Sequence, residues 1–208
     1  MKKIINVITL GDSFVGKTSI IQRIKDGTFN DNLERTHKFE DFTIERKYEK
    51  KNIIIDLFFK DTVGQEEYQE LPMQYIRDSH VVLFVFCDIK TLNKIKERWV
   101  KFYKEKANED NSRFILVGNK SDIFGDDRDK LIKQGEQFAE KIDALFLTCS
   151  AKSADNMDNL DRYITQEARR FIDLEGNEDL LSNNRDSIKL NDNKNKNNNN
   201  NIEKKKCC

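Results

Sequence analysis

Five short runs of nearly continuous apolar residues are spaced along the first 150 residues of the chain. They are residues 4–10, 53–59, 81–87, 114–118 and 145–149. Runs without a polar face predict strands covered on both sides, as in a parallel sheet. The segments between them carry apolar residues at helical spacing, and they predict helices over 18–26, 91–107, 127–142 and 153–173.

The alternation of strand and helix predicts an α/β fold, in which a mostly parallel sheet has helices on both faces. In the segment 127–142, one apolar face is formed by Leu131, Ile132, Phe138, Ala139 and Ile142. The more polar segment 38–48 alternates weakly and precedes "EKKN", so we expect 38–48 and 51–60 to pair as a hairpin at the sheet edge. The sheet would then have six strands.

The composition changes after residue 173. Apolar residues become sparse, and positions 191–201 contain eight asparagines. Such a segment cannot bury enough apolar surface to offset its chain entropy. We therefore expect a folded domain over 1–173 and a disordered, flexible tail over 174–208.

Charge and cysteine content narrow the possible partners and compartments. The 37 Lys and Arg residues balance the 37 Asp and Glu residues, so there is no global basic field and no nucleic-acid partner is expected. Cys87 and Cys149 lie in apolar runs and are expected to be reduced and buried in strands. No apolar run reaches the roughly 18–20 residues of a membrane-spanning helix, so we expect a soluble, cytosolic folded part.

The first motif with chemical meaning is "GDSFVGKT", which matches G-x-x-x-x-G-K-[ST] between the first predicted strand and helix. In such a loop, backbone N–H groups and the helix N-terminus face a phosphate. Lys17 would bring its charge to the β- and γ-phosphates, and the Thr18 hydroxyl can ligate Mg2+. The alternative is a chance glycine turn before a helix. The predicted phosphate-binding residues are Gly11, Asp12, Ser13, Phe14, Val15, Gly16, Lys17, Thr18 and Ser19.

Two further segments follow predicted strands and are expected to contact the base of a bound nucleotide. In "NKSD" (Asn119, Lys120, Ser121, Asp122), the Asp122 carboxylate can accept both the N1–H and the 2-amino proton of guanine. In "SAK" (Ser150, Ala151, Lys152), a backbone N–H can donate to guanine O6, and Phe29 is placed to stack on the base edge. Each motif alone is equally consistent with an ordinary surface turn. In this order at strand ends, they converge on one crevice.

The motif "DTVGQ" covers Asp61 to Gln65 and completes the set. Asp61 can hold Mg2+ through water, the Gly64 N–H can bond the γ-phosphate, and Gln65 can orient the attacking water.

With these motifs in place, residues 3–173 resemble a small GTPase of the Ras superfamily, a P-loop NTPase G domain. The resemblance implies a switch in which GTP orders two loops and hydrolysis releases them. It implies Gln65 and Lys17 as catalytic residues and Mg2+ held by Thr18, Thr36 and Asp61. Thr36 lies at the family's offset from Lys17. An exchange factor, a GTPase-activating protein and effectors are implied as partners.

Within that superfamily the chain resembles Rab proteins, which direct vesicle traffic. The resemblance rests on three segments: "GDSFVGKTS", "YIRDSHVVLFVFCDIKT" and the terminal Cys-Cys. The stretch "THKFEDF" (36–42) departs from the usual Rab T-I-G-x-D-F, and Lys60 stands where a tryptophan usually precedes D-T-A-G-Q. Phe42 and Tyr75 remain of the aromatic trio that Rab effectors often contact.

Three functions fit the motifs. The first is a cycling GTPase with slow hydrolysis, which Gln65 favours. The second is a G domain that holds GTP persistently as a scaffold, for which Val63 and "THKFEDF" leave room. Val63 replaces the family's alanine and is hypothesised to slow hydrolysis, although the backbone can equally absorb it. The third is a phosphotransferase, in which "NKSD" and "SAK" would lack a purpose.

The chain ends "KKKCC". On its own this ending allows metal binding, a disulfide or lipid attachment. Next to a Rab-like domain it implies geranylgeranyl groups on Cys207 and Cys208, delivered by an escort protein, because two lipid chains anchor stably where one does not. Lys204 to Lys206 would add attraction to anionic lipid. The expected location is the cytosolic face of an intracellular or plasma membrane, in exchange with the cytosol.

Overall fold

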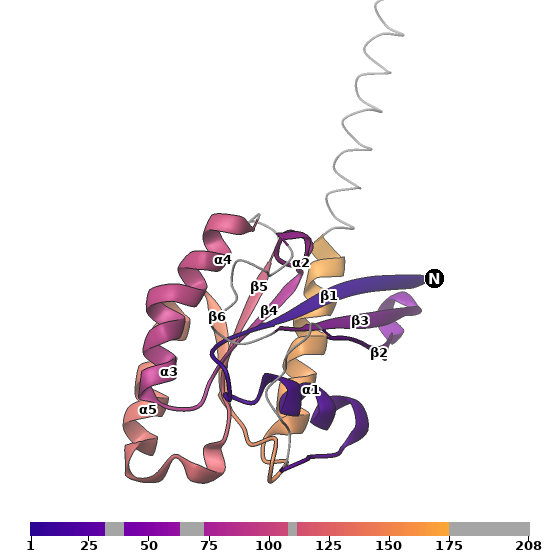
Figure 1. Ribbon diagram of the computed structural model, residues 1–208. Helices are drawn as coiled ribbons and strands as arrows, with labels where there is room; N and C mark the ends of the chain where they lie inside the picture. Colours follow the sequence, from indigo (N-terminus) through magenta and orange to yellow (C-terminus); the bar gives the residue numbers. More distant parts are fainter. Residues whose placement is uncertain (32–39, 63–72, 108–111, 175–208) are drawn as a thin grey trace, which may run out of the picture. The chain divides into compact units, whose positions relative to one another are not determined.

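The structure is a computed structural model that describes residues 1–31, 40–62, 73–107 and 112–174 (Figure 1). The chain divides into two compact units, Met1–Arg169 and Arg170–Cys208. The sheet and the cavity described below belong to the first unit.

The first unit is built on one six-stranded sheet in the order β2-β3-β1-β4-β5-β6. The β2–β3 pair is antiparallel, and every other neighbouring pair is parallel. The predicted fold class and edge hairpin are therefore confirmed. The strands are β1 (Lys2–Leu10), β2 (Glu40–Tyr48), β3 (Ile53–Asp61), β4 (Val81–Phe86), β5 (Arg113–Gly118) and β6 (Ala144–Thr148).

Helices lie in the connections between the strands and after the last strand. They are α1 (Lys17–Asp26), α2 (Met73–Arg77), α3 (Ile89–Lys94), η3 (Ile95–Trp99), α4 (Val100–Lys106), α5 (Arg128–Lys141) and a last helix over 157–174, with short 3-10 turns η1 (Glu49–Lys51), η5 (Ser121–Ile123) and η6 (Gly125–Asp127). The short helix α2 was not predicted. The last helix begins four residues later than expected.

The predicted helix over 91–107 is observed as the continuous segment α3–η3–α4, which starts at Ile89. The early start is explained by a capping box. The Asp88 carboxylate accepts from the Thr91 N–H at 2.7 Å, and the Thr91 hydroxyl accepts from the Asp88 N–H at 3.1 Å. The middle segment η3 is a turn of π-helix, which the sequence pattern did not predict.

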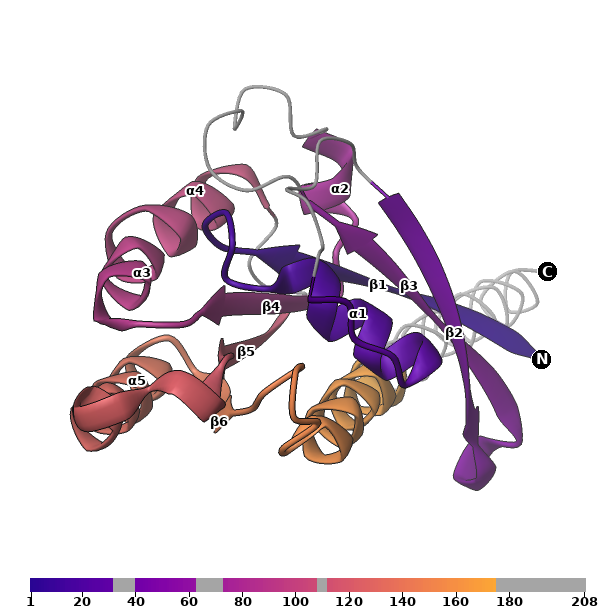
Figure 2. The same cartoon turned by 60° about the horizontal axis from the view of Figure 1, so that its bottom comes forward.

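The sheet is covered on both faces. All six residues of β4 are buried, as expected for a central parallel strand. One face packs a core of β1, β4 and β5 side chains against α2, α3, η3, α4 and α5, whereas Figure 2 shows α1 on the opposite side of the sheet. None of the helices in the described ranges combines the length and apolar content that a membrane crossing needs.

Both cysteines of the domain lie directly after the end of a strand, and β6 ends at Thr148, one residue before Cys149. Cys149 is buried and free. Cys87 is also free but only half-buried, because β4 ends at Phe86. The Cys87 N–H donates to the Thr91 hydroxyl at 3.0 Å. Cys87 therefore contributes to the cap at the start of α3. The prediction that the two cysteines lie within strands is therefore wrong, and burial is confirmed for Cys149 alone.

Candidate nucleotide site

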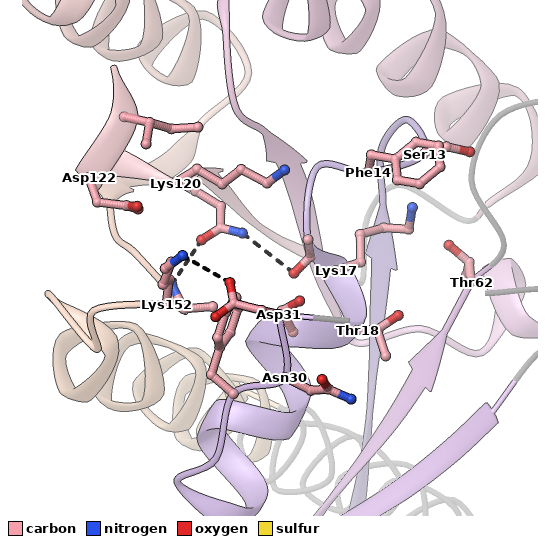
Figure 3. Close-up of a pocket in the computed structure, with 16 residues that line it drawn as sticks. Ser13, Phe14, Lys17, Thr18, Asn30, Asp31, Thr62, Lys120, Asp122 and Lys152 are labelled. Atoms are coloured by element: carbon pink, nitrogen blue, oxygen red, sulfur yellow. Dashed lines mark hydrogen bonds and ion pairs between the residues drawn. The ribbon is translucent and has the colours of Figure 1, made fainter. Parts of the chain in front are cut away.

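A cavity of about 370 Å³ lies where β1, β3, β5 and β6 end (Figure 3). It is lined by Ser13, Phe14, Gly16, Lys17, Thr18, Ser19, Phe29, Asn30, Asp31, Thr62, Asn119, Lys120, Asp122, Ile123, Ala151 and Lys152. Figure 3 shows Lys17, Thr18 and Thr62 at one end and Lys120, Asp122 and Lys152 at the other. Ligands of α/β sheets bind at this edge, outside the carboxyl ends of the strands.

The loop between β1 and α1 forms the first end. Its glycines allow close approaches that a side chain would block: a Cβ on Gly11 would lie 2.2 Å from the Val85 carbonyl oxygen, and one on Gly16 would lie 2.3 Å from Asn119 Nδ2. Lys17 is the first residue of α1 and is 6% exposed. Its ammonium donates to the carbonyl oxygens of Gly11 at 2.9 Å and Asp12 at 3.0 Å. The lysine is thus held across its own loop.

Phe14 is the unusual residue of this loop. Its backbone is left-handed, with φ at 63°, a conformation that costs a residue with a Cβ roughly 1 kcal/mol or more. The side chain is 70% exposed at the cavity rim.

Oxygen ligands gather beside Lys17. The Thr18 hydroxyl donates to Asp61 Oδ2 at 2.5 Å, and the Thr9 hydroxyl donates to Asp61 Oδ1 at 3.3 Å. Asp61 is fully buried at the end of β3. A hydroxyl and a carboxylate in contact are the hard donors that Mg2+ accepts, so these residues fit that ion. Among the described residues there is no cluster of three or more His, Cys, Asp or Glu that could hold a metal.

Asn119 connects the two ends of the cavity. Its side-chain amide donates to the Val15 carbonyl at 2.8 Å, and its Oδ1 accepts from the Ala151 N–H at 3.1 Å. The Asn119 side chain is 1% exposed. One residue therefore ties the phosphate loop to the segment after β6.

Asp122 lies in the short turn η5, which is separated from β5 by Asn119 and Lys120. The Ser150 hydroxyl donates to its Oδ1 at 2.5 Å and also accepts from the Ser153 N–H at 3.1 Å. Ser150 is fully buried and so orients the carboxylate from behind the cavity wall. Asp122 itself lines the cavity.

Charged residues lie around the end of the cavity that Lys120, Asp122 and Lys152 line, which is called the base end below. Lys152 and Asp31 form an ion pair at 2.9 Å, and this hydrogen bond raises the pKa of Lys152. Behind them, the Arg23 guanidinium donates to the carbonyl oxygens of Ala151 at 2.8 Å, Lys152 at 3.0 Å and Gly27. Arg23 thus fixes both the segment after β6 and the end of α1, from which the chain leads to Phe29.

Not every predicted site residue faces the cavity. Behind its lining lie Gly11, Asp12, Val15, Asp61 and Ser150, which contribute the backbone and side-chain contacts given above. Thr36, Val63, Gly64, Gln65 and the tail with Cys207 and Cys208 lie outside the described residues.

Four lining residues were not predicted: Asn30, Asp31, Thr62 and Ile123. Each lies within two positions of a predicted residue, so proximity to Phe29, Asp61 and Asp122 was the available signal.

Lys60 replaces the tryptophan of the Rab pattern and is buried, with 5% exposure. Its ammonium lies 4.6 Å from the centre of the Tyr75 ring, and the Tyr75 hydroxyl donates to Asp41 Oδ2 at 3.2 Å. Burial lowers the pKa of Lys60, while the nearby Asp78 and Asp41 oppose that change. Tyr75 is therefore held between the Lys60 ammonium and the Asp41 carboxylate.

Comparison with known proteins supports the same reading of the cavity. Residues 6–170 match the Ras family. The chain is also similar to the Ras-related protein RabC of Dictyostelium discoideum, with 35% identity over 150 residues that make up 70% of this chain and 74% of that protein. The fold order, the loop between β1 and α1 and these matches agree. The chain belongs to the Ras family of small GTPases.

Proposed function

We propose that this GTPase is a Rab-like molecular switch that alternates between GTP- and GDP-bound states and acts in vesicle and membrane traffic. The observation that supports guanine-nucleotide binding is the set of residues that meet in one cavity. Lys17 and Thr18 line it at one end, Asp122 and Ala151 line it at the other, and Asn119 joins the two through hydrogen bonds. The similarity to RabC supports the Rab-like part.

At the phosphate end, the proposed roles follow from charge and geometry. The Lys17 ammonium and the N–H groups at the start of α1 favour the β- and γ-phosphates. When bound, Mg2+ neutralises charge on these phosphates, and Thr18, Asp61 and Thr36 would hold it. Gly64 would donate its N–H to the γ-phosphate, and Gln65 would orient the attacking water.

At the base end, the proposed selector is the Asp122 carboxylate. An ionised carboxylate only accepts hydrogen bonds, so it pairs with the two donors on the N1 and 2-amino edge of guanine. Adenine does not present that pair of donors. Phe29 would stack on the base, and Ser150 keeps the carboxylate oriented.

Base selection can be tested by changing one functional group. Asn in place of Asp122 still offers an oxygen to the Ser150 hydroxyl but presents an N–H to the base, which matches the 2-carbonyl of xanthine. We expect Asp122→Asn to lose labelled GDP and to gain xanthosine diphosphate, while Asp126→Asn on the neighbouring exposed turn binds GDP like the wild type. GDP binding by Asp122→Asn at the wild-type level, or displacement of GDP by ATP, would instead favour a phosphotransferase.

The nucleotide that copurifies with the full-length protein separates a cycling switch from a scaffold. Bound GDP supports cycling, whereas bound GTP supports the persistent GTP-bound scaffold. Single-turnover hydrolysis by the wild type and by Val63→Ala then tests whether Val63 slows the reaction. Equal rates would remove the strain hypothesis and leave the switch intact.

The membrane part of the proposal rests on the last residues. Geranylgeranyl groups on Cys207 and Cys208, with Lys204 to Lys206 beside them, would anchor the protein to a cytosolic membrane face. Mass spectrometry of the cellular protein should find both thiols lipidated. Cys207→Ser with Cys208→Ser should move a tagged chain to the cytosol. Two free thiols in the wild type would refute the anchor alone.

A further inference from the structure

The side chain of Asp12 faces away from the cavity and is 3% exposed. Its two oxygens contact the helical segment α3–η3–α4. Lys94 Nζ lies 2.5 Å from Oδ2, and the Trp99 indole N–H donates to Oδ1 at 3.1 Å. Figure 2 shows the loop between β1 and α1 beside α3 and α4. The phosphate loop is thus attached to this segment by a residue of its own.

The π-helical turn explains how both partners reach one carboxylate. In an α-helix with 3.6 residues per turn, positions five apart point about 140° away from each other. In a π-helix, the hydrogen bond joins residues five apart, so such residues lie one above the other. Lys94 directly precedes the turn Ile95–Trp99, and Trp99, five positions later, is the last residue of that turn. The turn therefore places an ammonium and an indole N–H on the same side.

The contact is too costly to be incidental. A carboxylate removed from water loses several kcal/mol of solvation unless it is paired and hydrogen-bonded. Here one oxygen has a charged partner and the other has a neutral donor, and Trp99 itself is 2% exposed. By contrast, a surface ion pair on the same segment, Lys101 with Glu105, spans 3.9 Å between exposed side chains and carries little energy.

The backbone of Asp12 performs a second task. Its carbonyl oxygen accepts from the Lys17 ammonium at 3.0 Å, beside the Gly11 carbonyl at 2.9 Å. Side chain and carbonyl belong to one residue, so fixing the carboxylate on the helix also fixes the carbonyl that orients Lys17. The chain of contacts runs from Lys94 and Trp99 through Asp12 to Lys17.

We propose that Asp12 is a positioning residue, which ties the phosphate loop to α3–η3–α4 and thereby sets the place of the Lys17 ammonium at the β-phosphate. This inference deepens the proposed function and rests on it, because it requires a bound guanine nucleotide. Loss of the tie leaves Lys17 in the sequence but lets its acceptors shift. Small displacements of a charged positioning group cost up to about 100-fold in function, and we expect GDP to dissociate on the order of 10-fold faster.

The test uses full-length protein loaded with GDP. Lys94→Met removes the ammonium at similar length, and Lys94→Arg keeps the charge. Trp99→Phe removes the indole donor together with part of a buried ring. The matched control is Asp161→Asn, which breaks the Arg46–Asp161 ion pair at 2.8 Å far along the chain from the loop. The readouts are the 31P chemical shift of the β-phosphorus of bound GDP, the GDP dissociation rate and the melting temperature.

We expect Lys94→Met and Trp99→Phe to move the β-phosphorus signal and speed GDP release, and Lys94→Arg to restore both toward the wild type. Asp161→Asn should lower the melting temperature without moving the signal. If either Lys94→Met or Trp99→Phe fails to fold, the other variant decides the question. An unchanged signal and release rate in the folded variants overturn the positioning role while leaving the proposed function intact. A wild type that binds no guanine nucleotide overturns both.

Discussion

Replacing Asn119 by alanine isolates the contact that joins the two ends of the cavity. The Asn119 side chain is 1% exposed, and it satisfies the Val15 carbonyl at 2.8 Å and the Ala151 N–H at 3.1 Å. Alanine leaves both backbone groups buried without that partner. Each such loss costs about 1–3 kcal/mol, so the unfolding free energy should fall by roughly 2–6 kcal/mol. That is a large share of the roughly 5–15 kcal/mol of a typical domain.

The loss should be measurable in two ways. For a chain of this size, each kcal/mol shifts the melting temperature by about 2–4 °C, so Asn119→Ala should melt about 4–24 °C below the wild type. GDP dissociation should also accelerate, because the loop before Lys17 and the segment carrying Ala151 are no longer joined through Asn119. Thermal melting and stopped-flow release of a fluorescent GDP analogue provide the two values.

Asn119→Asp separates the two hydrogen bonds. Aspartate keeps an oxygen for the Ala151 N–H but turns the second group from donor to acceptor, facing the Val15 carbonyl. We expect it to be no more stable than Asn119→Ala, since it also buries a charge. Asn159→Ala, which removes an amide that donates to Asn156 Oδ1 at 2.6 Å on the surface, is the control and should change stability by less than about 0.5 kcal/mol. If Asn119→Ala melted and released GDP like that control, the bridging role would be refuted.

Three further changes test the loop and the buried thiol. Gly16→Ala should speed GDP release and lower the melting temperature far more than Gly27→Ala, because both have positive φ but only the Gly16 Cβ meets an atom, at 2.3 Å; equal melting temperatures would contradict this. Phe14→Gly should raise the melting temperature by about 2–4 °C, since it removes a left-handed cost of roughly 1 kcal/mol and little buried surface; a lower value in the same melt would contradict it. Burial raises the pKa of Cys149 from 9.0 to about 12, so the neutral thiol contributes stability below pH 9 that falls by about 1.4 kcal/mol per pH unit above it. Urea unfolding at pH 8 and pH 10 should show the unfolding free energy of the wild type falling relative to that of Cys149→Ala. The same free-energy difference at both pH values would disprove the pKa shift.

The strands and the cavity-lining loops could be predicted because their signals are local. A strand buried on both faces must be apolar throughout, as β4 is, and loops at the ends of parallel strands must meet at one edge. The capping box of Asp88 and Thr91 is a weaker signal, because it consists of two residues three positions apart. It starts the helix earlier than predicted and takes Cys87 as part of the cap.

Features that depend on pairs distant in sequence could not be predicted. Asp31 and Lys152 are separated by 121 positions, and neither residue type announces its partner. Arg23 donates to three backbone carbonyls, and because every residue has a carbonyl, the sequence does not indicate which ones it binds. The π-helical turn inserts a five-residue hydrogen bond into an otherwise ordinary helical pattern, and five-residue α2 is too short for periodicity to be detected.

The Arg23 guanidinium has a consequence for how the domain opens. It binds carbonyls on both sides of the base end, at Gly27 and at Ala151 and Lys152. A fluctuation that frees the segment after β6 must either break this planar ion from its acceptors or carry the last turn of α1 with it. Amide protons of that turn and of residues 150–152 would then exchange with solvent as one cooperative unit. Guanine release would be a collective unfolding event of two chain segments instead of the swing of a single loop.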